Sequence, residues 1–266
     1  MSFLKPACSV LCAHGLVRRF LWLSLLSCFV FCTATGQEQE GVIRYLITHN
    51  WSKKLAAVDY ISQQTRDRET YISGNRWEWK EYANLYFSPS ASKYEDSEER
   101  AQKDDEGYSW RREAYQIRRD YVAKRQADII TALGKVYLVE DSIHAPHWKI
   151  YNDLKEVAGH LCMKAYCEDT LKSQKIVAWF ALDMPLPAGP ERLGGLPGIV
   201  LEADINQGAM TLVADKIELR KLTTELDPPK KIKAKKVNEA GYRTLLKNFY
   251  DERRKAEEVP FWGIRY

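Results

Sequence analysis

The sequence predicts a mainly β protein, of the β-rich α+β type, with a helix near its C-terminus. Aromatic residues make up 12% of the chain and include 15 Tyr and 8 Trp, a load that favours strands over an Ala/Leu-rich helical bundle. Several segments alternate apolar and polar residues, as half-buried strands do. The proportions of hydrophobic (45%) and charged (29%) residues are typical of a globular protein with a sizeable core.

Residues 1–36 have the pattern of a secretory signal peptide. Arg18 and Arg19 precede an apolar run over 20–32, which is too short to span a bilayer, since spanning takes about 20 apolar residues. Ala34 and Gly36 are the small residues that a signal peptidase reads. We expect cleavage after Gly36, no transmembrane segment in the mature chain, and a protein that is periplasmic, outer-membrane-associated or secreted; the alternative is an uncleaved amphipathic anchor.

Cleavage changes the charge of the protein. The segment 1–36 carries Lys5, Arg18 and Arg19 and no acidic residue, so the formal charge of +4 falls to +1 in the mature chain. A charge this small predicts no general attraction to nucleic acid.

Cleavage also removes four of the six cysteines. A lipoprotein acylated at Cys28 or Cys32 is a further alternative, although neither residue lies in a good lipobox. The remaining pair, Cys162 and Cys167, suggests a disulfide in an oxidising compartment. In one straight strand, however, their Cα atoms would stand roughly 16 Å apart, beyond the reach of a disulfide. Either the chain turns between them or both thiols are free.

The N-terminal half of the mature chain reads as strands separated by polar segments. The sequence predicts a first strand over 41–50, a strand at 71–72 entering a turn, and an alternating strand over 76–82 that continues to 87. Residues 88–107 are polar and charged and predict a solvated loop. We expect a helical start for 109–127, followed by strands at 135–139 and 148–151.

The centre of the chain gives the clearest strand pattern. Strands are predicted over 156–166, 176–182, 199–203 and 210–222, and Asn-Gln-Gly at 206–208 is typical of a hairpin turn. A Pro/Gly-rich stretch over 184–198 separates the second and third of these strands.

After Leu222 the composition changes. Asp227-Pro228-Pro229 breaks the chain, and a basic run follows at 230–236, either as a solvated linker or as a contact for anionic lipid or an acidic partner. Asn238 is a good helix cap, and the apolar residues that follow have helical spacing: Tyr242, Leu245, Leu246 and Phe249. We therefore expect three regions: the signal peptide (1–36), a β-rich domain (37–222), and a basic linker with a helix and an aromatic tail (223–266).

The stretch 148–203 carries an ordered set of motifs. It reads Trp148-x-Ile150, Lys155-x-Val157-x-Gly159-x-x-Cys162-x-Lys164-Ala165, Ala178-Trp179-Phe180, Met184-Pro185, Gly189-Pro190 and Gly195-Leu196-Pro197-Gly198-Ile199-Val200-Leu201. This set resembles the signature of the GLPGLI family of exported Gram-negative envelope proteins. That family is similar to the N-terminal bowl-like domain of some secreted peptide:N-glycanases. The resemblance implies a curved, mostly antiparallel sheet, bowl-like or half-barrel in form, and an envelope address; fold alone does not imply activity.

The glycines and prolines of the motif predict a structural role. Pro185, Pro187 and Pro190 cannot join a central ladder. Gly194, Gly195 and Gly198 permit positive φ on either side of Leu196-Pro197. We expect an ordered crossover that directs Leu196 and Ile199 into the core, with a binding loop at the rim of the sheet as the alternative.

No catalytic constellation is visible in the sequence. His144, His147, His160 and Cys162 match no metal motif, and there is no nucleophile elbow or phosphate loop. The acids Asp183, Glu191, Glu202 and Asp204 flank the motif and are explained equally well as a charged rim or as acid/base groups. We expect no catalytic residue, no metal and no cofactor, with an unrecognised secreted hydrolase as the alternative.

The aromatic residues carry the main binding hypothesis. Trp77 and Trp79 share one face of their predicted strand, and most often such a face is core. In a bowl, that face would instead line a concavity, and we expect Trp77, Trp79, Tyr86 and Trp179 to contribute to it. The function predicted is a non-catalytic binding or accessory module, whose partner is a small apolar ligand, a glycan or an envelope protein.

Overall fold

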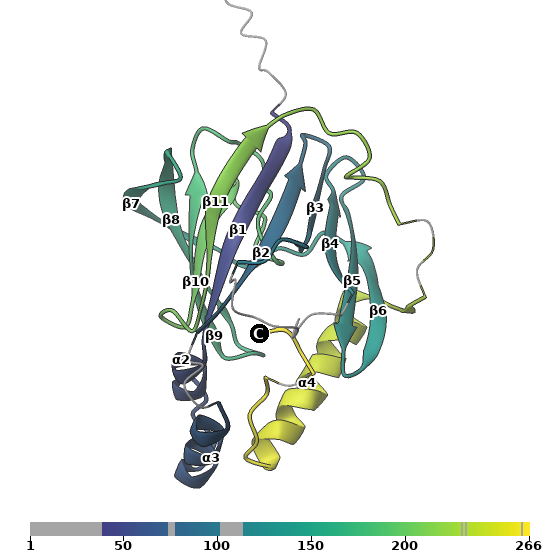
Figure 1. Ribbon diagram of the computed structural model, residues 1–266. Helices are drawn as coiled ribbons and strands as arrows, with labels where there is room; N and C mark the ends of the chain where they lie inside the picture. Colours follow the sequence, from purple (N-terminus) through teal and green to yellow (C-terminus); the bar gives the residue numbers. More distant parts are fainter. Residues whose placement is uncertain (1–38, 74–77, 102–113, 230, 232, 262) are drawn as a thin grey trace, which may run out of the picture. The chain divides into compact units, whose positions relative to one another are not determined.

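A computed structural model describes residues 39–73, 78–101, 114–229, 231, 233–261 and 263–266. Within these residues, twelve strands form one open, curved sheet in the order β12-β6-β5-β4-β3-β2-β1-β11-β10-β9-β8-β7 (Figure 1). The mainly β fold with a curved, mostly antiparallel sheet and a C-terminal helix is therefore confirmed. Trp77 and the predicted signal peptide lie outside the described residues.

The elements follow the chain in this order: β1 (Gly41–Asn50), α2 (Trp51–Ala56), α3 (Gln63–Ser73), β2 (Glu78–Phe87), β3 (Ala91–Asp96), β4 (Tyr115–Asp120), β5 (Arg125–Ala132), β6 (Lys135–Ser142), β7 (Lys149–Val157), β8 (His160–Asp169), β9 (Gln174–Ala181), β10 (Val200–Ile205), β11 (Met210–Leu219), β12 (Lys235–Val237) and α4 (Glu239–Lys255).

The first strand lies at the centre of the sheet. Strand β1 pairs antiparallel with β2 along its whole length and with β11 from Gly41 to His49. The remaining neighbours also pair antiparallel, except that β12 runs parallel to β6. Because β12 comes from the basic run, part of that run is an edge strand of the sheet.

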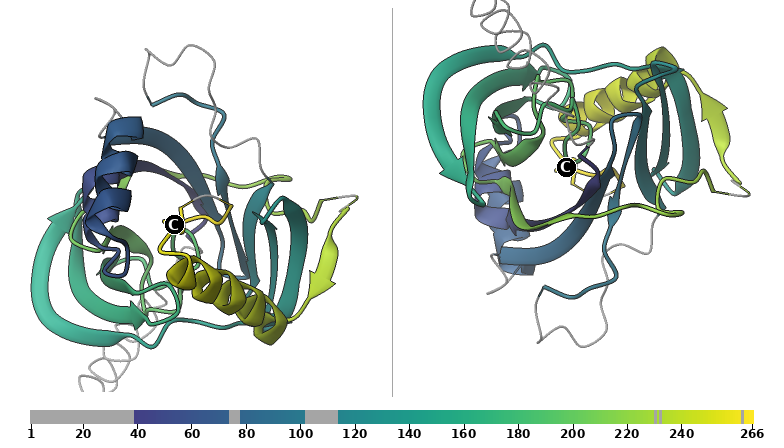
Figure 2. Two further views of the ribbon diagram at one scale, coloured as in Figure 1. Left: turned by 90° about the horizontal axis from the view of Figure 1, so that it is seen from below. Right: turned by 90° about the horizontal axis from the view of Figure 1, so that it is seen from above.

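The two faces of the sheet differ in burial. Along β1, Ile43, Tyr45 and Ile47 are fully buried, whereas the residues between them are half-buried. This alternation defines an inner face that carries the core and an outer face opposite it. Figure 2 shows the sheet curving around the inner face.

The protein's own segments cover the inner face. The crossover between β9 and β10 inserts Met184, Leu196 and Ile199, all at most 2% exposed, into the same core cluster as the sheet residues. Helix α4 adds a buried stripe to this cluster: Tyr242, Leu246, Phe249 and Tyr250. Burial of each such side chain stabilises the fold by roughly 1.5–3 kcal/mol. The bowl is thus largely filled by the chain itself.

Helix α4 begins where the sequence predicts. The Asn238 side chain caps the helix by accepting a hydrogen bond from the backbone N–H of Gly241 over 2.9 Å. Arg253, Arg254 and Lys255 occupy its last turn, where positive charge interacts favourably with the helix dipole.

Two local predictions are wrong. Tyr71 and Ile72 belong to helix α3, and both are largely exposed. The predicted loop 88–107 contains strand β3, in which Tyr94 is 1% exposed. In both cases a short polar segment gave a weak local signal, and packing against neighbouring elements decided its conformation. The predicted helical start of 109–127 lies outside the described residues, and from Tyr115 onward the chain forms β4, a turn and the start of β5.

The predicted strand 156–166 is a hairpin instead. Ala158 and Gly159 connect β7 to β8 with φ of 50° and 83°, the left-handed conformations of a tight two-residue turn. The turn at 206–208 is confirmed, because Asn206, Gln207 and Gly208 all have positive φ.

The Pro/Gly-rich crossover is held by backbone hydrogen bonds. Gly195 N–H donates to Pro187 O over 2.9 Å, and Val200 N–H donates to Ala188 O over 3.0 Å. Gly195 has a φ of 93°, as expected for a glycine that permits positive φ. The expectation of positive φ is wrong for Gly194 and Gly198. A Cβ at Gly198 would lie 1.9 Å from Ala181 O, so a close backbone approach requires this glycine.

Among the described residues, no helix is long and apolar enough to cross a membrane.

Candidate binding cavity

The structure does not bring the predicted aromatic residues together. Trp79 lies on the inner face of β2 and is half-buried. Tyr86 alternates with the buried Leu85 and Phe87, so it lies on the outer face. Trp179 likewise alternates with buried residues of β9 and faces outward. The predicted concavity lined by this set is therefore absent from the described residues, because the pleat sends its members to opposite faces.

The two outward aromatics contact lysines instead. Lys155 Nζ lies 4.6 Å from the centre of the Trp179 ring and donates to Glu202 over 2.6 Å. Lys93 Nζ lies 4.8 Å from the Tyr86 ring centre. These are cation–π contacts on the sheet surface.

The structure contains no bond between Cys162 and Cys167. Both are free and buried on strand β8, where no turn separates them. The disulfide considered from the sequence is therefore absent. Burial raises the pKa of Cys162 to about 11 and that of Cys167 to about 12, so both act as small buried hydrophobes.

The histidines considered as metal ligands lie in different surroundings. His160 Nδ1 is 2.8 Å from Asp183 Oδ2 at the edge of the sheet. His144 and His147 are exposed in the loop between β6 and β7. Within the described part of the chain, no three His, Cys, Asp or Glu side chains cluster so as to hold a metal ion.

A cavity of about 560 Å³ lies on the inner side of the sheet. We call it the central cavity. Its walls come from the loop between β6 and β7, the turn between β8 and β9, the crossover, helix α4 and the C-terminal residues Arg265 and Tyr266. This volume is within the range of small-molecule sites, roughly 300–1,000 Å³.

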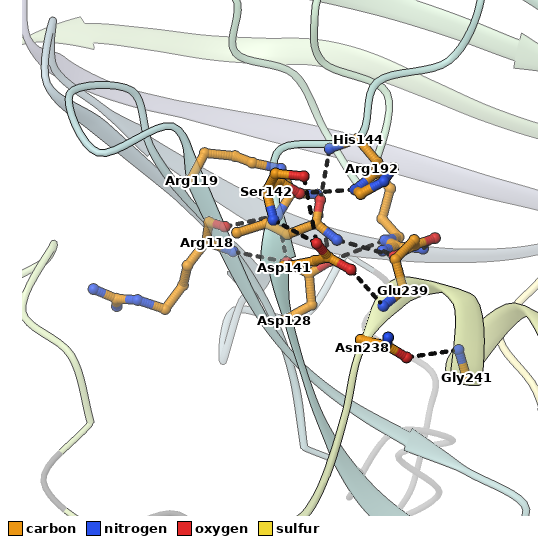
Figure 3. Close-up of polar contacts among 11 residues, drawn as sticks. Arg118, Arg119, Asp128, Asp141, Ser142, His144, Arg192, Asn238, Glu239 and Gly241 are labelled. Atoms are coloured by element: carbon orange, nitrogen blue, oxygen red, sulfur yellow. Dashed lines mark hydrogen bonds and ion pairs between the residues drawn. The ribbon is translucent and has the colours of Figure 1, made fainter.

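Arg192 and Glu239 line the cavity and belong to a buried ionic cluster (Figure 3). Asp128 of β5 is fully buried and forms ion pairs with Arg119 and, over 2.9 Å, with Arg192 Nε. Arg192 also pairs with Glu239, the first residue of α4. Burial opposes the charge of Arg192, but Asp128 and Glu239 more than offset this and raise its pKa. The cluster ties the sheet, the crossover and the helix together.

Further hydrogen bonds extend this cluster. Gln126 Nε2 donates to Glu239 Oε2 over 2.9 Å, and its Oε1 accepts from the backbone N–H of His144 over 3.0 Å. The backbone N–H of Glu239 donates to Asp141 Oδ2 over 3.1 Å. The loop that carries His144 is thereby attached to the start of α4 (Figure 3).

A second ionic cluster lies at Glu191. Its carboxylate accepts hydrogen bonds from Tyr115 Oη and from Arg265 Nε, the latter over 2.7 Å. Arg265 also pairs with Asp96 over 2.8 Å and stacks on the Tyr115 ring, with Cζ 3.7 Å from its centre. Burial disfavours the charged guanidinium, yet the two carboxylates hold the pKa of Arg265 well above its ordinary value.

The turn between β8 and β9 supplies the remaining polar groups. Lys172 Nζ donates to the backbone carbonyl of Arg265 over 3.0 Å. Gln174 is 4% exposed, and its Nε2 has no hydrogen-bond partner. Both residues line the central cavity.

Sequence reasoning reached only part of this site. Glu191 is one of the acids that flank the Pro/Gly-rich motif, whereas no pattern in the sequence distinguishes Asp128, Arg192, Glu239 or Arg265. A charged residue on a strand usually faces solvent. The sequence predicts its burial only where it takes a position that the alternation of the strand assigns to the buried face. Asp128, which lies next to the buried Ile129 and Ile130, carried a weak signal of this kind.

The fold and the cavity define a single-sheet β module whose inner face is closed by a crossover and a helix. The chain belongs to the family described as the N-terminal domain of peptide N-glycanase, whose model matches residues 97–244, more than half of the chain.

Solved structures support the same assignment of fold. Two structures of PNGF-II, in the C2 and P21 space groups, match with TM-scores of 0.52 and 0.50 at 13% and 14% identity. Each match covers 78% of this chain and 32% or 33% of the PNGF-II chain. The chain thus spans about a third of the length of these structures, and at this identity the likeness shows the fold alone. A search of curated proteins finds no match.

Proposed function

We propose that the chain is an exported, non-catalytic accessory module that binds a glycan in the central cavity. The observation that carries the proposal is a cavity of ligand size in which the buried carboxylates already have fixed partners. Glu191 is engaged by Arg265 and Tyr115, and Glu239 by Arg192 and Gln126. Carboxylates held in this way orient their partner side chains and neutralise the charge of the arginines. They are poorly placed to exchange protons with a substrate.

Membership of the N-glycanase N-terminal family supports the glycan as the ligand class. The chain matches the part of those enzymes that is described as an N-terminal domain. The lining of the cavity combines aromatic rings, such as Tyr115 and Tyr242, with charged and amide groups. A sugar offers apolar ring faces and hydroxyl groups, and it suits such a mixed surface.

The binding test uses isothermal titration with N-glycans released from a glycoprotein. Ala145 is exposed and lines the cavity, so Ala145→Trp should obstruct it and abolish the heat of binding. Ala123, an exposed residue of the β4–β5 turn, provides the matched control, and Ala123→Trp should bind as the parent does. Equal binding by both variants would place the ligand elsewhere.

Catalysis is tested separately by incubating the chain with a denatured N-glycoprotein. We expect no release of glycan, as measured by the mass of the protein product. Release that disappears in Glu191→Gln would instead support the alternative of a secreted hydrolase.

Export and the envelope address belong to the same proposal. They are supported by the charged and apolar segments before Ala34-x-Gly36 and by the Gly195–Leu201 motif that resembles the GLPGLI signature. Sequencing the mature protein from a cell that secretes it should find Gln37 as the first residue. A full-length chain in the cytoplasm would contradict this address.

A further inference from the structure

The central cavity has an imbalance between hydrogen-bond donors and acceptors. Its acidic residues already accept hydrogen bonds: besides Glu191 and Glu239, Asp169 accepts from the backbone N–H groups of Leu171 and Lys172, and Glu168 accepts from Tyr166 Oη. The acceptors of the walls are thus largely used by the protein itself.

The donors are not used to the same extent. Gln174 is 4% exposed, and its buried Nε2 has no hydrogen-bond partner. The ammonium of Lys172 has three donors, of which one reaches the Arg265 carbonyl, and it forms no ion pair closer than 4.0 Å with a described carboxylate. Arg243 of α4 lines the same cavity and is exposed. Buried donors without acceptors are uncommon and call for a partner.

We propose that the central cavity recognises a carboxylate on its ligand through Lys172 and Gln174, with Arg243 contributing from helix α4. This inference rests on the proposed glycan-binding function and specifies the ligand class as an acidic saccharide. A carboxylate has two acceptor oxygens and a single charge, which match one ammonium and one amide N–H. A phosphate would bring a second negative charge toward Asp169, Glu191 and Glu239, and it fits less well.

The electrostatics of Lys172 agree with this arrangement. Burial lowers the pKa of its ammonium. The nearby Asp169 and Glu191 oppose this shift, whereas Arg192 and Arg265 add to it. Since an incoming carboxylate stabilises the charged form, it would raise the pKa of Lys172 and offset part of the shift that burial causes.

The test compares glucuronate with glucose, which differ by the carboxylate, and adds glucose 6-phosphate as a third probe. Binding is followed by chemical-shift titration of the ¹⁵N-labelled protein, which detects weak affinity. We expect glucuronate to bind about tenfold more tightly than glucose or more, as a charge-assisted hydrogen bond allows, and more tightly than glucose 6-phosphate.

Variants connect this preference to the named residues. Lys172→Met and Gln174→Leu should each remove most of the preference for glucuronate over glucose, and Lys172→Arg should retain it. Lys175→Met, at an exposed position of the same strand, is the matched control and should behave as the parent. Thermal unfolding of each variant identifies any that fails to fold, and Lys172→Arg then carries the comparison.

The outcomes separate the two proposals. If a neutral N-glycan binds but glucuronate shows no preference over glucose, the carboxylate site is wrong and the glycan-binding function stands. If glucose 6-phosphate binds most tightly, the site is a phosphate site and the inference is also wrong. If no saccharide shifts resonances of the cavity residues, both proposals fail.

Discussion

Arg265 donates a hydrogen bond from Nε to Glu191 Oε1 over 2.7 Å, and so ties the C-terminal segment to the crossover. Glu191 has a φ of 52°, a conformation that a non-glycine residue adopts at a cost. Both side chains are 10% exposed. The pair lies at the wall of the central cavity, and it joins two segments that the sheet alone would leave unconnected.

Loss of one member of this pair should destabilise the fold strongly. Arg265→Met leaves Glu191 and Asp96 without their guanidinium, and removing one partner of a buried ion pair costs about 3–5 kcal/mol. Urea unfolding measures the change. In a double-mutant cycle, adding Glu191→Gln to Arg265→Met should cost less than Glu191→Gln alone. A loss below about 0.5 kcal/mol, typical of surface substitutions, would mean that the tail is not held by this pair.

Gly198→Ala should destabilise the protein through a steric clash. The added Cβ would lie 1.9 Å from Ala181 O and 3.2 Å from the Phe180 ring, so the β9–crossover contact must open, at a cost of about 1–3 kcal/mol. Gly159→Asn is the control, because Gly159 has positive φ and no atom within 4 Å of an added Cβ, and Asn tolerates this conformation. Unfolding midpoints that fall equally for both variants would contradict the close-approach argument.

The two cysteines should react slowly in the folded protein. Burial raises the pKa of Cys162 to about 11 and that of Cys167 to about 12, and the thiolate is the reactive form. At pH 8 iodoacetamide should therefore leave both largely unmodified, whereas in denaturant without reductant both should be alkylated rapidly. Mass spectrometry counts the adducts. Two residues that resist alkylation in denaturant until reductant is added would reveal a disulfide.

Alkaline pH should unfold the protein partly through its buried tyrosines. Burial raises the pKa of Tyr242 to about 12, compared with about 10 in an unfolded chain. The folded state therefore binds this proton more tightly, so its contribution is complete below pH 10 and is lost as pH rises toward 12. The melting temperature should fall over this window, and less steeply in Tyr242→Phe. A Tyr242→Phe variant with the same pH profile as the parent would assign the loss to other groups.

Much of the fold could be predicted because its signals are local. The alternation of β1 and β9, the Asn-Gln-Gly turn at 206–208 and the Asn238 cap depend on residues within a few positions of one another. The local signal failed where short polar segments take their conformation from neighbours. Strand β3, for example, is stabilised by β2 and β4 on either side. The sequence of Ala91–Asp96 has no apolar/polar alternation that would predict a strand.

The placement of the predicted aromatic residues on one face could not be predicted for a related reason. Aromatic content was visible, but the face on which each ring lies depends on register, and a shift of one residue reverses it. Trp79 therefore faces inward, while Tyr86 and Trp179 face outward. The sequence also left open whether α4 covers the inner face, and the core cluster that includes Tyr242, Leu246 and Phe249 shows that it does.

Patterns within the chain thus specified a β-rich sheet, its central strands, the crossover and the closing helix. Apolar periodicity and the turn-forming Gly and Pro residues act between residues that are close in the sequence. Tertiary structure alone decided which charges become buried partners. Arg192 lies 64 residues from Asp128 and 47 residues from Glu239, and in the sequence each resembles an ordinary surface charge. Only when the sheet, the crossover and the helix pack together does desolvation require these charges to pair, and two of them, Arg192 and Glu239, then line the central cavity.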